Sequence, residues 1–108
     1  MNKIVINLNK VWGKSSFFNL LKNELAFPAY FGNNWDAIDE CMRDLYWLDS
    51  DTTICFNNAD KLKSRDKLLY DRIVLFIEEC QKYWETRTPN KNGNRIVVNM
   101  QLNHSQSD

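Results

Sequence analysis

Three carboxylates gathered between residues 36 and 40 are the part of this chain with the clearest capacity for chemistry. Asp36 and Glu40 are four positions apart, so on a helix they share one face, and Asp39 stands beside Glu40. The Cβ atoms of such a pair are roughly 5–6 Å apart. Neighbouring phosphates on a nucleic-acid strand have a similar separation, roughly 6 Å. Such a row can pair with the cations of a phosphate-holding site, or it can be an ordinary solvated helix face.

The cost of this arrangement bears on that choice. Like charges at this spacing destabilise a helix by about 0.2–0.5 kcal/mol per pair. Asp36 recovers part of this cost if it lies in the first helical turn, where the helix dipole favours a negative charge. Arg43 follows Asp39 by four residues and can offset part of the repulsion. Judged alone, the row is better explained as a solvated face that tolerates the strain; the alternative is that the strain is retained for a cationic partner.

Enzymatic chemistry finds little support in the residue types present. The single histidine, His104, lies in a polar tail, so no Ser-His-Asp or Cys-His arrangement is available. The glycines Gly13, Gly32 and Gly93 are scattered and form no phosphate loop. No Cys/His spacing suits zinc, and paired carboxylates on a helix are more often solvated than catalytic. We therefore expect no enzyme, no catalytic residue, no cofactor and no metal.

The length and charge of the chain limit its domain number and its functional class. With 108 residues the chain predicts one domain, residues 1–102, followed by a polar tail, 103–108. Its 14 basic and 14 acidic residues give zero net charge, which argues against a direct nucleic-acid binder. Local charge is uneven: the charged residues within 36–51 are mostly acidic, and those within 61–72 are mostly basic. Three cysteines without paired spacing predict buried, reduced thiols in a cytoplasmic protein, and neither a signal peptide nor a membrane span is expected.

The apolar pattern predicts the elements that position these residues. Strands are expected at 3–8, 52–56 and 95–102, helices at 17–25, 35–47 and 67–84, and a single helical turn at 59–62. Asn34 and Asp66 are expected as N-caps, and residues 86–94 as a loop. Helical connections between strands indicate an α/β fold with a small parallel sheet packed on helices.

A motif of about 20 residues resembles the barstar family of ribonuclease inhibitors. The resemblance lies in the run Tyr30-Phe31-Gly32-Asn33-Asn34-Trp35-Asp36-Ala37, followed by Glu40-Cys41 and Arg43-Asp44-Leu45. The order of elements extends it to about residue 102. It implies a barstar-like single domain with a three-stranded parallel sheet packed against about four helices. It also implies an immunity protein that blocks a barnase-type ribonuclease with the second helix and the loop before it.

The same resemblance implies which residues bind that partner. By position, Tyr30, Asn34, Asp36 and Glu40 match binding residues of the family, Asp39 is the neighbour of the anchoring position, and Glu79 on the long helix adds an acidic contact. Tyr30 also has a second interpretation, as a buried residue that fixes the loop. The implied partner is a secreted or toxin ribonuclease, and the free protein is expected to be a cytoplasmic monomer.

Departures from the family pattern point to a different cognate nuclease. Glu40 stands where the barnase inhibitor has an aspartate, Asp39 stands where it has an aromatic residue, and Arg43 places a cation on the expected binding face. Two other functions stay open. One is an interaction module of the same fold without a nuclease target. The other is an RNA-binding domain that uses residues 61–72, for which a solvated helix face is the better explanation.

Overall fold

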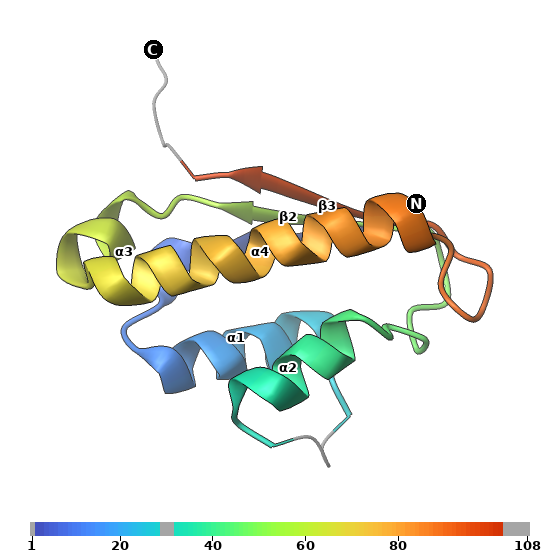
Figure 1. Ribbon diagram of the computed structural model, residues 1–108, viewed down its shortest axis with the longest axis horizontal. Helices are drawn as coiled ribbons and strands as arrows, with labels where there is room; N and C mark the ends of the chain where they lie inside the picture. Colours follow the sequence, from blue (N-terminus) through green and yellow to red (C-terminus); the bar gives the residue numbers. More distant parts are fainter. Residues whose placement is uncertain (1, 29–31, 103–108) are drawn as a thin grey trace.

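Three parallel strands form the sheet of this protein, in the order β1-β2-β3 (Figure 1). The computed structural model describes residues 2–28 and 32–102. β1 spans Asn2–Asn7, β2 spans Thr52–Asn57 and β3 spans Ile96–Gln101. Each strand lies within one or two residues of its prediction, and the predicted parallel sheet is confirmed.

The helices fill the connections between these strands. They are a short 3-10 helix η1 (Leu8–Lys10), α1 (Lys14–Leu25), α2 (Trp35–Met42), α3 (Asp60–Arg65) and α4 (Lys67–Arg87). In Figure 1, α1 and α2 lie together below α4, and α3 lies beside the first turns of α4. Among the described residues, none of the helices combines the length and the apolar character needed to cross a bilayer.

In the part of the chain that the structure describes, the helices lie against one face of the sheet (Figure 1). In β2 the side chains of Thr52, Ile54 and Phe56 are buried, whereas Thr53 and Cys55 between them are half-buried. This alternation follows from the two-residue period of a strand. The prediction that all three thiols are buried is therefore wrong for Cys55, which points away from the helices. Cys41 and Cys80 are buried, and all three cysteines are unpaired.

An aromatic cluster joins α1, α2 and α4. The ring of Trp35 lies 5.0 Å from that of Phe18, 5.8 Å from that of Phe17 and 5.9 Å from that of Phe76. Phe17 and Phe76 also meet edge to face at 5.7 Å. Trp35, the first residue of α2, is therefore an anchor that fixes the start of this helix against the core.

α2 is shorter than the predicted helix at 35–47, because the chain turns sharply after Met42. Leu45 adopts a left-handed backbone conformation with φ of 47°, which no helix continues. Side chains from distant parts of the sequence donate hydrogen bonds to the carbonyls at the end of the helix. Trp84 Nε1 donates to the Met42 carbonyl at 2.7 Å, and Asn90 Nδ2 donates to the Leu45 carbonyl at 2.8 Å. Tertiary hydrogen bonds thus end the helix where local sequence would allow it to continue.

Candidate functional site

The start of α2 is built by the capping that the sequence predicts. Asn34 has extended backbone angles, and its side-chain oxygen accepts a hydrogen bond from the Ala37 amide at 2.8 Å. Next to it, Lys22 of α1 donates to the Asn33 side-chain oxygen at 2.5 Å. These two bonds fix the direction of α2 relative to α1, so Asn34 shapes the site through the helix terminus.

The two faces of α2 divide as the spacing requires. Ile38, Cys41 and Met42 are buried against the core. Asp36 and Glu40 are exposed on the other side. Within residues 2–28 and 32–102, no ion pair shorter than 4 Å engages either carboxylate. Both charges are therefore open to a partner, and a cation can approach them without displacing one from this chain.

Asp39 has a different environment from its two neighbours. It is half-buried, and burial raises the pKa of its carboxyl group above the usual value. Arg72 and Arg43 lower that pKa by attraction, while Glu79 and Asp36 raise it by repulsion. Because desolvation is the largest of these effects, the site holds a carboxylate whose negative charge a bound cation would stabilise.

A groove between α2 and α4 contains this carboxylate. It has a volume of about 520 Å³ and is lined by Asp39, Arg43, Glu79, Cys80, Lys82 and Tyr83. α4 thus brings Glu79 to the side of α2, although Asp39 and Glu79 are 40 residues apart in the sequence. Arg43 does not turn away from this face, because its side chain is part of the groove wall. The groove consequently offers both signs of charge.

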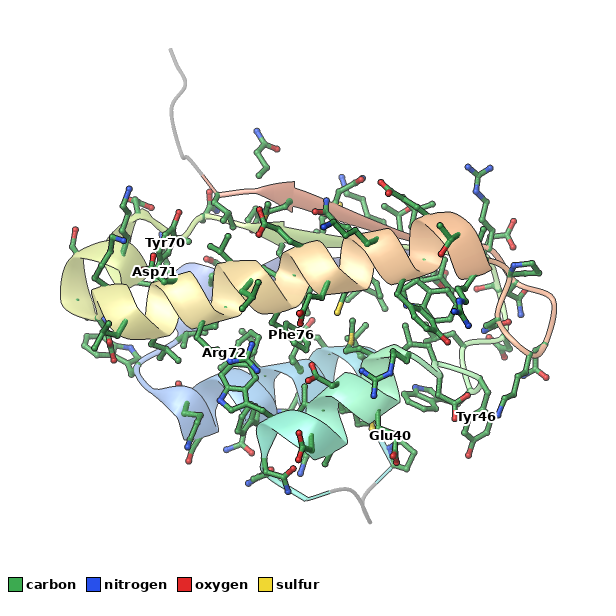
Figure 2. All side chains as sticks on the ribbon, viewed as in Figure 1. Glu40, Tyr46, Tyr70, Asp71, Arg72 and Phe76 are labelled. Atoms are coloured by element: carbon green, nitrogen blue, oxygen red, sulfur yellow. The ribbon has the colours of Figure 1, made fainter. Side chains whose placement is uncertain are left out.

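Arg72 is a component of the site that sequence reasoning missed. Its guanidinium group lies 4.0 Å from the centre of the Trp35 ring, a stacking contact between α4 and α2. Figure 2 shows Arg72 and Phe76 on the side of α4 that faces α1 and α2. The available signal was its spacing: Arg72 and Glu79 are seven residues apart, which places both on one face of a helix.

Most of the predicted site residues come together in this region. Asp36, Asp39 and Glu40 lie along α2, Glu79 faces them from α4, and Asn34 caps the helix. Tyr30 and the tail at 103–108, with His104, lie outside the described residues. In the described part of the chain, no group of three or more His, Cys, Asp or Glu side chains is arranged to hold a metal ion. The arrangement is suited to binding a charged surface.

Comparisons with known proteins agree with this geometry. Residues 1–101 match the model of the family described as Barstar (barnase inhibitor). A protein of Bacillus subtilis (strain 168) with the name "Putative ribonuclease inhibitor YrdF" is 28% identical over 82 residues, which cover 76% of this chain and 88% of that protein.

Proposed function

We propose, because this chain belongs to the Barstar (barnase inhibitor) family, that it inhibits a ribonuclease by inserting α2 into the active site of that enzyme. Membership of this family makes it an inhibitor-type protein rather than an enzyme. The binding surface, called here the acidic face, consists of Asp36, Asp39 and Glu40 on α2 together with Glu79 on α4. The segment before α2, with Tyr30 and Asn34, would border it.

The observation that carries this proposal is the open state of the two outer carboxylates. Asp36 and Glu40 are exposed, one turn apart, and unpaired within the described residues. A ribonuclease holds RNA phosphates with cationic side chains. Two carboxylates at this spacing can replace two phosphates of the substrate in contact with those cations. Catalysis then stops because the substrate site is occupied.

The groove between α2 and α4 supplies the selectivity of this surface. A cation of the enzyme that enters it meets Asp39 and Glu79, whereas Arg43 and Lys82 repel a second one nearby. The enzyme must therefore place an acidic or neutral group opposite Arg43. This requirement distinguishes the cognate nuclease from an enzyme whose entire cleft is cationic.

The class of partner follows from the same chemistry. We propose a barnase-type ribonuclease that is secreted or forms the toxic domain of a larger protein. The inhibitor would act in the cytoplasm as a monomer and protect the cell that makes it, as an immunity protein does. Neutral net charge means that attraction of a basic enzyme depends on local clusters of carboxylates such as the acidic face.

Replacement of Glu40 tests the proposal. Glu40→Ala should weaken affinity for the cognate ribonuclease by a factor of at least about thirty, since loss of one partner from a buried charge pair costs about 2–5 kcal/mol. Inhibition of RNA cleavage and isothermal titration calorimetry would measure the effect.

Glu85→Ala provides the matched control. Glu85 is an exposed carboxylate on α4 that lines a different cavity, beside β3, so its loss should change affinity less than about two-fold. Equal affinity of Glu40→Ala and the parent would contradict the proposed binding surface. Association that is insensitive to salt, without inhibition, would instead support an interaction module.

A further inference from the structure

The α3 end of the molecule carries an exposed tryptophan that the acidic face does not use. This surface consists of Trp12, of Leu68 in the first turn of α4, and of the cations of η1, α3 and the first turns of α1 and α4. The Trp12 side chain is 74% exposed and Leu68 is 83% exposed. Tryptophan is highly buried on average, so an indole with this exposed fraction is a candidate surface for binding a ligand.

Trp12 is held in place by Arg65. The guanidinium group of Arg65 lies 3.9 Å from the centre of the indole ring. Its Nη2 atom donates to the carbonyl of Val11 and, at 3.3 Å, to that of Asn9. Arg65 therefore covers one face of the indole while remaining anchored to the backbone. The exposure of Trp12 shows that the opposite face stays open.

Further hydrogen bonds join η1 to α3. Asn9 Nδ2 donates to Asp60 at 2.9 Å, and the Lys61 amide donates to the side-chain oxygen of Asn9 at 3.0 Å. The platform made by Trp12 and Arg65 is thus rigid before any ligand arrives. A ligand that stacks on it would lose less free energy to ordering of the protein.

Positive charge gathers at the same end of the molecule as this platform. Six cationic residues are exposed at the α3 end: Lys10, Lys14, Lys61, Lys63, Arg65 and Lys67. Three carboxylates lie at the same end, and one of them pairs with Lys67, so cations outnumber carboxylates there but Lys67 is already in an ion pair. Asp60 accepts from Asn9, Asp66 caps α4 by accepting from the Leu69 amide at 3.1 Å, and Asp71 pairs with Lys67 at 2.7 Å. Figure 2 shows Tyr70 and Asp71 at this end.

From these observations we propose that the α3 end binds single-stranded nucleic acid, with one base stacked on the open face of Trp12 and neighbouring phosphates held by lysines of the α3 end. Stacking on an aromatic ring combined with a cationic surface is how single strands are bound without sequence preference. The sequence favoured a solvated face for these cations. The stacked and exposed Trp12 is the structural observation that changes this interpretation.

A protein partner explains the composition less well. Lysine is depleted in the cores of protein interfaces, whereas here five lysines are exposed at the same end of the molecule as the aromatic residue. One aromatic platform gives room for a few nucleotides, which predicts weak binding. The proposal does not depend on inhibition of a ribonuclease, because none of its residues belongs to the acidic face.

Fluorescence anisotropy with labelled eight-nucleotide RNA and DNA of mixed sequence tests the proposal. At 50 mM salt both strands should bind the parent protein, and Trp12→Ala should weaken binding about ten-fold, as expected for loss of one stacked base. Trp12→Phe should retain most of the affinity. Lys63→Glu should weaken binding and reduce the slope of log affinity against log salt, since fewer phosphate contacts release fewer counterions.

Leu75→Ala is the matched control, because Leu75 is an exposed apolar residue elsewhere on α4, at 49% exposure. It should bind as the parent does, and thermal unfolding should show that all variants fold. Absence of binding at 50 mM salt would overturn the proposal. Binding unaffected by Trp12→Ala would also overturn it, as would self-association that depends on Trp12 without nucleic-acid binding. Unchanged ribonuclease inhibition by Trp12→Ala would separate this surface from the acidic face.

Discussion

Arg72 shows how a half-buried residue of α4 can influence the charge of a candidate binding surface on α2. Arg72 stacks on Trp35, which anchors the start of α2, and the same guanidinium group attracts the Asp39 carboxylate. The contact therefore fixes the helix and partly offsets the burial of its half-buried acid. Asp36 and Glu40, which are further out, are exposed to solvent.

Asp39→Asn should raise stability while it weakens binding. In the folded protein the pKa of Asp39 lies above its unfolded value, chiefly because of burial. A raised carboxyl pKa contributes stability below the unfolded pKa, and this contribution is lost as pH rises through the folded pKa. At pH 7 the ionised Asp39 is thus a cost that asparagine removes. The Tm of Asp39→Asn should exceed that of the parent at pH 7, and the difference should shrink towards pH 3.

Asp36→Asn is the control for this experiment. Asp36 is exposed in the first turn of α2, where the helix dipole favours its charge. Its replacement should leave the Tm at pH 7 unchanged or slightly lower. A lower Tm for Asp39→Asn at pH 7 would contradict the role of burial. Reduced affinity for the ribonuclease is expected from both variants.

At the scale of elements, α2 depends on its cap because it has only eight residues. Short helices gain little from propensity and are held by their ends and by packing. Asn34→Ala removes the acceptor for the Ala37 amide and should lower the free energy of unfolding by about 1 kcal/mol. Asn34→Asp keeps an acceptor and should retain stability. Urea unfolding measures the free energy of unfolding of both variants. An equal loss in the two would show that the side-chain acceptor at position 34 is not what stabilises α2.

The elements that sequence predicted well are those specified by local patterns. Asn34 and Asp66 could be predicted as caps because each side-chain acceptor is close in sequence to the backbone amide that donates to it and to the helix that it caps. The end of α2 was missed because it depends on Trp84 and Asn90, which lie more than 40 residues away. Asn90 was expected only as part of a loop, yet it is buried and organises the turn after α2.

The candidate site also has features that follow from local sequence and features that depend on tertiary structure. The exposed row on α2 follows from a four-residue spacing, so Asp36 and Glu40 could be placed from sequence. The stacking of Arg72 on Trp35 and the position of Arg43 in the groove depend on how α4 crosses α2. No local pattern reports that crossing, and the mixed charge of the groove could therefore not be predicted.

At the scale of the whole molecule, zero net charge means that attraction of a basic enzyme depends on local clusters of carboxylates, of which the acidic face is the one proposed to bind. Arg43 lies in that face, so Arg43→Gln should raise the association rate constant several-fold at low salt by strengthening the local negative field. Lys3→Gln changes net charge equally at an exposed position on β1, so it should have little effect. Stopped-flow measurements would compare the two. At 1 M salt, where the screening length is about 3 Å, the advantage of Arg43→Gln should vanish. Equal acceleration by both variants would mean that total charge, rather than the field at the acidic face, governs capture.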